Sequence, residues 1–96
     1  MKPSHLESEV LGFLMDDLEA PQSLERNVSE ALARPIVQSE ILEALLRLAE
    51  MGLAQAFEFE RVSASFRPVE VNNALSRTDL WFKATQAGEA LIRDVV

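Results

Sequence analysis

The stretch EILEALLRLAEMGL, residues 40–53, decides the fold of this chain. Ile41, Leu45 and Leu48 recur at intervals of four and three residues, the spacing that places side chains on one face of a helix. Gly52 follows them and can take the left-handed conformation that closes a helix. The pattern predicts an amphipathic helix from about residue 37 to residue 52, with a wide apolar face that is buried on more than one side.

The polar face of this helix carries Glu40, Glu43 and Glu50 against the single cation Arg47. One interpretation is a solvated face on which Glu43 and Arg47, four residues apart, form a pair that contributes about 0.3 kcal/mol. A second interpretation is a docking surface for a basic protein partner. The sequence leaves both open.

Two further helices are predicted before this one. Ser4 and Glu7 fit a capping box, in which each side chain bonds the backbone amide of the other, so a first helix is expected over residues 4–18. Pro21 interrupts the pattern. A second helix is expected to begin at Ser23 or Asn27, both suitable N-caps, and to end before Pro35.

After residue 53 the period changes from that of a helix to that of a strand. Residues 53–62 alternate, with phenylalanines on one side and glutamates on the other, and residues 79–85 are rich in bulky side chains. Residues 63–77 contain Ser, Asn and Pro and are predicted to be a loop or ribbon turn. Trp81 and Phe82 must face opposite sides of their strand, so one belongs in the core and the other against a terminal helix or at an interface. A last helix, capped by Thr85, is expected to follow.

The composition indicates one small domain spanning residues 1–96. Hydrophobic residues make up 48% of the 96 residues, which is enough for a core, and the absence of cysteine excludes disulfides and thiolate chemistry. No apolar run has the length of a signal peptide or a membrane span, so we expect a soluble, cytoplasmic protein without membrane contacts. The net charge of −7 is uneven, because residues 1–60 hold four Lys or Arg against twelve Asp or Glu, whereas residues 61–96 hold five against four.

The order helix, helix, helix, strand, ribbon turn, strand, helix resembles the winged helix-turn-helix domain of bacterial transcriptional regulators. Two motifs carry the resemblance: the third helix with its Gly52-Leu53 exit, and LWFKATQAGEAL, in which Thr85 and Gly88 open the last helix. The resemblance covers about residues 6–91. It implies an α+β, mostly α fold with a three-helix core, a two-stranded wing over approximately residues 54–84 and a C-terminal helix.

The resemblance also implies which residues would contact DNA. In the family, the third helix enters the major groove and the wing contacts the backbone. The matching candidates are the polar residues at the start and on the face of the third helix, together with the wing arginines: Gln38, Ser39, Arg47, Arg61, Arg67 and Arg77. Glu40 and Glu43 depart from the family pattern, because carboxylates repel phosphate.

The leading hypothesis is therefore a small DNA-binding transcriptional regulator that acts as a homodimer through its first and last helices. The alternative, from a different class, is an acidic winged helix that binds a protein on its helical face. A small-ligand sensor, with Trp81 lining a pocket at a dimer interface, is a third possibility. The sequence offers no catalytic residues, cofactor motif or phosphate loop, and the lone His5 lacks the convergent partners of a metal site, so we expect no enzyme and no metal.

Overall fold

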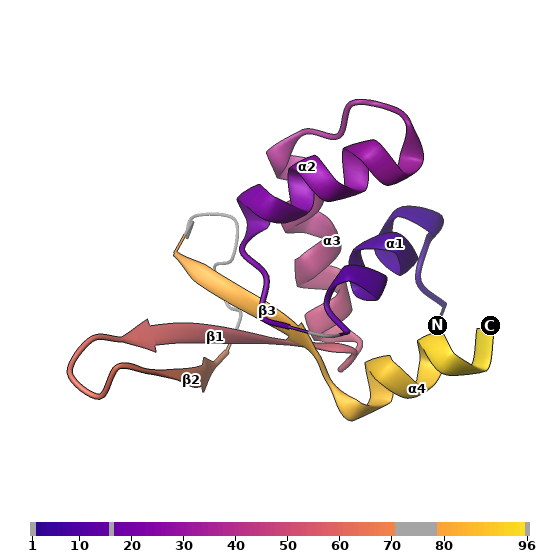
Figure 1. Cartoon of the computed structure of the whole chain (residues 1–96). Coiled ribbons are helices and arrows are strands. Elements are labelled where there is room, and N and C mark those ends of the chain that lie inside the picture. The colour runs from indigo at the N-terminus through magenta and orange to yellow at the C-terminus, as the bar shows by residue number, and fades with distance from the viewer. Residues whose placement is uncertain (1, 16, 71–78, 96) are drawn as a thin grey trace.

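Three helices lie against one face of an antiparallel sheet, and a fourth helix follows the last strand (Figure 1). The computed structural model describes residues 2–15, 17–70 and 79–95. Within them the fold is α+β and about half helical. The elements, in chain order, are α1 (His5–Phe13), α2 (Pro21–Leu32), α3 (Gln38–Glu50), β1 (Ala54–Glu60), β2 (Ser65–Val69), β3 (Leu80–Ala84) and α4 (Gln86–Val95).

The sheet has the strand order β2-β1-β3, with β1 paired on both sides. The prediction of a two-stranded ribbon is wrong, because the sheet has three strands. Ser65–Val69 forms a strand where a loop was predicted. Pro68 contributed to that error, since proline lacks the amide that a central strand needs. It is tolerated here because β2 is an edge strand, with only β1 beside it among the described residues.

The first two helices differ from their predicted bounds. The capping box at Ser4 and Glu7 is confirmed, but α1 ends at Phe13, well before residue 18. Glu19 instead runs extended and exchanges two backbone hydrogen bonds of 2.9 Å with Phe82 of β3. Helix α2 begins at Pro21, not at Ser23 or Asn27. Proline suits the first helical position, where its missing amide has no helical partner to lose.

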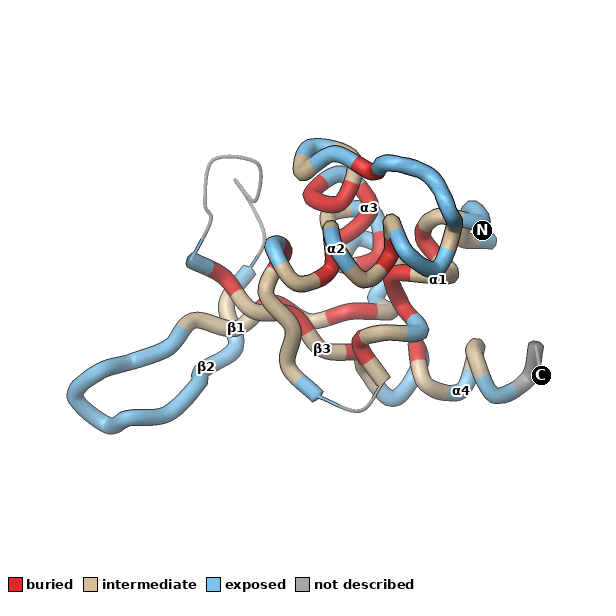
Figure 2. The backbone as a smooth tube through the Cα atoms, turned by 45° about the horizontal axis from the view of Figure 1, so that its top comes forward, coloured by how far each residue is buried: buried red, intermediate tan, exposed pale blue. Residues whose placement is uncertain are grey.

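The core lies between α1, α2, α3 and the sheet face that they cover. The apolar face of α3 is fully buried at Ile41, Leu45 and Leu48, as the spacing of these residues predicts. Of the neighbours Trp81 and Phe82, Phe82 is the one in the core. Figure 2 shows this burial concentrated where the helices meet the sheet, whereas residues 59–68 of the β1–β2 hairpin are exposed throughout. The hairpin thus extends beyond the part of the sheet that the helices cover.

The exit of α3 and the start of α4 are joined by hydrogen bonds. Gly52 has φ +74°, so it takes the left-handed conformation expected of it. The Thr85 hydroxyl donates to the Gly52 carbonyl at 2.7 Å and accepts from the Gly88 amide at 3.1 Å, which confirms Thr85 as the cap of α4. In the described part of the chain, no helix combines the length and apolarity needed to cross a lipid bilayer.

Candidate interaction surfaces

The exposed side of α3 is a narrow stripe along the helix. Ser39, Glu43, Arg47 and Glu50 are its exposed members, spaced by four, four and three residues. The surface that the DNA hypothesis places in the major groove therefore carries two carboxylates and one guanidinium. We refer to these four residues as the α3 stripe.

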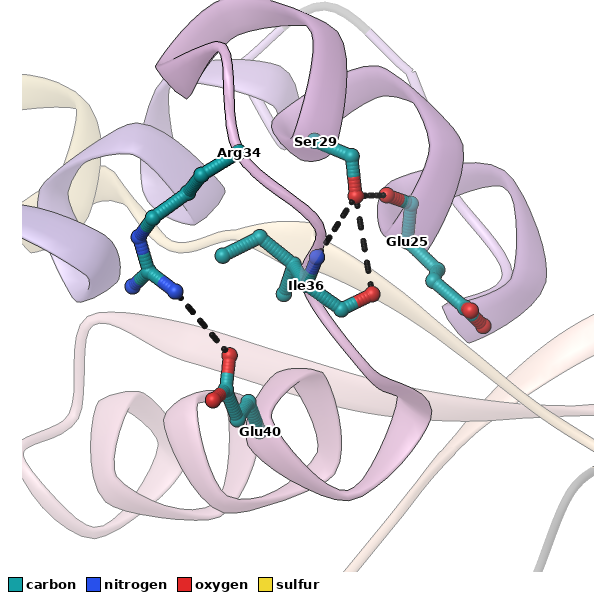
Figure 3. Close-up of polar contacts among 5 residues, drawn as sticks. All are labelled: Glu25, Ser29, Arg34, Ile36 and Glu40. Atoms are coloured by element: carbon teal, nitrogen blue, oxygen red, sulfur yellow. Dashed lines mark hydrogen bonds and ion pairs between the residues drawn. The ribbon is translucent and has the colours of Figure 1, made fainter.

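Glu40 lies off the stripe, in the first turn of α3, and faces the segment that joins α2 to α3 (Figure 3). Its Oε2 atom is covered and lies 3.7 Å from Nη1 of Arg34, on the far side of the turn. The Ser29 hydroxyl holds the same turn, since it donates to the Glu25 carbonyl at 2.6 Å and accepts from the Ile36 amide at 3.0 Å. The carboxylate of Glu40 thus faces Arg34 at ion-pair distance, although its Oε2 atom accepts no hydrogen bond from the described residues.

Gln38, the first residue of α3, does not present its amide to solvent. Both Nε2 and Oε1 are buried, and neither has a hydrogen-bond partner within the described part of the chain. A side chain that reads a base edge must offer its donor and acceptor outward. Ser39, one residue later, is exposed and satisfies that condition.

Arg47 pairs with α1 rather than with its own helix. Its Nη1 atom lies 3.7 Å from Oε2 of Glu7, a carboxylate that is only 9% exposed and whose other oxygen accepts from the Ser4 amide at 2.9 Å. The expected partner Glu43 forms no ion pair with Arg47 in the described chain. Sequence reasoning missed Glu7 because the two residues are forty positions apart and only the packing of α1 on α3 brings them together.

The hairpin arginines differ in their surroundings. Arg67 lies opposite Glu58 in the β1–β2 register, and its Nη2 and Nε atoms donate to the same Oε1 at 2.8 and 3.2 Å. Arg61 is exposed in the turn between the strands, and the structure gives it no ion pair with another described residue. Arg77, the third wing candidate, falls outside the described residues.

The sheet face that points away from α1–α3 is aromatic. The register pairs Phe59 with Phe66 and Phe57 with Trp81, and residues directly opposite in an antiparallel pair share a face. Phe66 packs edge to face against both Phe59 and Trp81, with ring centroids 5.2 and 5.6 Å apart. We call Phe57, Phe59, Phe66 and Trp81 the aromatic face.

This face remains open to solvent although its members are large. Phe59 is 45% exposed and Phe66 is 38% exposed, and Val62 in the adjoining turn is 96% exposed. The alternation of residues 53–62 is confirmed, but its core side consists of Ala54 and Ala56 rather than the phenylalanines. The small alanines are buried because α3 packs directly over them.

No match to this chain is found among protein-family models, curated proteins or solved structures. Two surface hollows border α3, and Trp81 lines neither of them. One is lined by Lys2, Ser4, Glu7, Arg47, Glu50 and Met51. The other is lined by Ala49, Glu50, Ala54, Gln55, Ala56, Pro68, Val69 and Glu70. Among the described residues, no three His, Asp or Glu side chains gather as metal ligands would.

Proposed function

We propose that this chain is a winged-helix module that acts by binding protein through its sheet. Support for the winged-helix assignment comes from the element order, from Gly52 at the exit of α3, and from the Thr85–Gly88 junction that ties α4 to that exit. The β1–β2 hairpin, which extends beyond the helices in Figure 1, corresponds to the wing.

The aromatic face is the main observation that supports the proposal of protein binding. Contiguous exposed apolar surface is uncommon on proteins that act alone, and aromatic side chains are enriched where proteins meet. Two exposed phenylalanines, Phe59 and Phe66, lie on this face beside the half-buried Phe57 and Trp81, and Val62 in the adjoining turn is nearly fully exposed. Together they match that description. Water would be released from this surface when a partner covers it, which is the main favourable term in association.

The charges of the candidate DNA face favour protein over DNA. Most of the affinity for duplex DNA comes from cations that neutralise phosphates. Arg47 and Arg67 already lie beside the carboxylates Glu7 and Glu58, so DNA would have to replace those contacts. On the α3 stripe, Glu43 and Glu50 would meet the phosphates directly.

DNA binding by a small transcriptional regulator is the second candidate, and two residues favour it. Arg61 is exposed in the hairpin turn, where a wing would touch the backbone, and Ser39 is exposed in the first turn of α3. In this alternative, Ser39 contacts the major groove while Arg61 contacts a phosphate.

Site-specific photo-crosslinking separates the two candidates. A photoreactive phenylalanine analogue is placed at Phe59 on the aromatic face, at Glu43 on the α3 stripe, or at Gln22, an exposed position of α2 that serves as the control. In the cells that make the protein, we expect protease-sensitive adducts from position 59 that exceed those from the control. Adducts from position 43 that nuclease removes, with none from position 59, would overturn the proposal in favour of DNA.

A titration of the purified protein provides a second, independent check. We expect no binding to a random-sequence duplex at about 50 mM salt, even at about 100 μM protein. That concentration matches the weakest dissociation constants of ordinary nonspecific DNA binding. A dissociation constant below about 10 μM that rises steeply with salt would contradict the proposal, because that dependence is the signature of phosphate contacts.

A further inference from the structure

The backbone groups of β3 have directions that contacts outside the sheet determine. Phe82 exchanges two hydrogen bonds of 2.9 Å with Glu19, so its amide and its carbonyl both point away from β1. In an antiparallel sheet the two groups of one residue point to the same side, and the side alternates along the strand. Ala84 agrees, because its amide also points away from β1 and donates to the Leu14 carbonyl at 3.0 Å. Trp81 must therefore direct its amide and carbonyl toward β1.

The same alternation continues across β1. Phe57 lies opposite Trp81 in the register, so its backbone groups bond to β3. Its neighbour Ala56 must then point the other way, toward β2, where it lies opposite Val69. The pair of Ala56 and Val69 is thus one that exchanges both of its hydrogen bonds.

Two residues of β2 are left with backbone groups that point outward. Val69, Arg67 and Ser65 bond to β1, because they alternate along the strand from the pair just assigned. Phe66 and Pro68 point away from β1, to the outer edge of the sheet. No other described strand lies beside this edge.

We propose that Pro68 closes this edge of the sheet to a strand from another chain. An added strand would bond to the outward residues of β2, and Phe66 offers it both an amide and a carbonyl. Pro68 offers a carbonyl only, since its ring replaces the amide hydrogen. Ala64, the next residue in the alternation, lies in the turn with φ +51°, outside the strand conformation. The edge therefore holds one complete pairing site.

The exposure of β2 is what makes a closed edge useful. Ser65 to Pro68 are all exposed, and Phe66 is a large apolar residue with 38% of its surface open to solvent. An exposed apolar edge is a template on which copies of the same chain pair with one another, and proline is one of the residues that prevent it.

The effect of the proline on such a pairing can be counted. Two copies of β2, antiparallel about a twofold axis at Arg67, would set Phe66 of each copy opposite Pro68 of the other. Each of these two pairs would exchange two hydrogen bonds if residue 68 carried an amide, and proline removes one bond from each pair. It also leaves each Phe66 carbonyl against a ring instead of a donor, and an interior carbonyl without a donor is costly.

This role of Pro68 is independent of what binds the aromatic face. That face presents side chains, whereas the edge presents backbone groups. Closure of the edge can therefore be refuted while the proposed function stands, and the proposed function can be refuted while the edge remains closed.

Two variants that differ by a single N–H group test the proposal. Pro68→Ala supplies an amide hydrogen, and Pro68→N-methylalanine, introduced by chemical ligation, supplies a methyl group in its place. Sedimentation velocity compares both with the unchanged chain over about 5–500 μM protein, the range in which weak complexes form. The net charge of −7 is the same in all three, so its repulsion cancels in the comparison.

We expect Pro68→Ala to associate more tightly than the other two proteins by on the order of thirtyfold, because two hydrogen bonds are regained. Equal association of the alanine and N-methylalanine variants would overturn the proposal, since the amide hydrogen would then have no effect. Exchange of the Phe66 amide hydrogen locates the contact. In associated Pro68→Ala this amide should become protected, and association without that protection would place the contact elsewhere and overturn the proposal.

Amide exchange in the unchanged chain gives an arm that needs no substitution, so a variant that fails to fold does not decide the matter. The amides of Arg67 and Val69 should be protected by their bonds to β1, whereas the Phe66 amide should exchange rapidly. Protection of Phe66 equal to that of Arg67 would refute the outward direction on which the closure depends. Circular dichroism of both variants shows whether each retains the fold.

Discussion

Replacing Gly88 with alanine tests the packing that joins α4 to the rest of the fold. A Cβ atom at this position would collide with the carbonyl oxygen of Leu53 and would lie 3.1 Å from Cδ1 of Leu11. The Leu53 oxygen belongs to the backbone and already accepts the Thr85 amide at 3.0 Å, so it cannot move aside alone. Helix α4 must shift instead.

The expected loss of stability follows from the contacts that such a shift weakens. Overpacking of a tight site costs about 1–3 kcal/mol, and a collision with backbone belongs at the upper end of that range. Two hydrogen bonds of Thr85, to Gly52 and to Leu53, are strained at the same time, each worth about 1 kcal/mol. Alanine favours the helix over glycine by up to about 1 kcal/mol, which offsets part of the loss. A net destabilisation of at least about 2 kcal/mol remains.

Gly12 in α1 provides a matched control, since a Cβ there meets no atom within 4 Å. Gly12→Ala should therefore show the helix preference alone and should raise the melting temperature. For a domain of this size, about 2 kcal/mol corresponds to a fall of about 8–16 °C for Gly88→Ala. Thermal unfolding followed by circular dichroism measures both. If Gly88→Ala unfolds at or above the temperature of Gly12→Ala, the close approach of α4 to Leu53 is wrong.

Three further substitutions test other parts of the fold. Gly52→Ala places a side chain at φ +74° in otherwise open space and should cost about 1–2 kcal/mol in urea unfolding; an unchanged midpoint would contradict the left-handed exit of α3. Glu40→Gln weakens the pair with Arg34 and should lower stability by under about 1 kcal/mol, with Arg34→Gln giving no further loss once Glu40 is changed; additive losses would show that the two side chains act separately. Burial, and secondarily the charge of Asp17, raise the pKa of Glu19 above its ordinary 4.5, so the stabilising contribution of this group is present below pH 4.5 and is lost as the pH rises. Glu19→Gln should therefore raise the melting temperature at pH 7 and lose that advantage near pH 3.5; an advantage that persists at low pH would contradict the assignment.

Local patterns predicted the parts of the fold that local chemistry determines. The Ser4 capping box, the apolar face of α3, the left-handed Gly52 and the Thr85 cap depend on residues within a few positions of one another, and each is confirmed. The end of α1 and the existence of β2 depend on partners far along the chain. Glu19 is extended because Phe82 pairs with it, and residues 65–69 are a strand because β1 lies beside them.

Charge pairing was the least predictable feature, because the tertiary fold decides which charged side chains lie close together. The i,i+4 rule favoured Glu43 for Arg47, yet the packing of α1 on α3 brings the buried carboxylate of Glu7 within reach of Arg47. A pair whose carboxylate is largely shielded from water is screened less than one on an open helix face. The same rule could not assign Glu40 to Arg34, since that contact requires the turn at residues 33–37 to be closed.

The aromatic face shows how a confirmed period can still mislead about which side is buried. Alternation fixes only that Phe57 and Phe59 share one side of β1 and that Ala54 and Ala56 share the other with the glutamates. Hydrophobicity alone assigns the phenylalanines to the core. Burial of the alanines instead follows from α3, which lies directly on β1 and leaves room only for small side chains. The larger residues are thereby directed to the open side, so the close packing of α3 on the sheet also accounts for the aromatic surface on the opposite face.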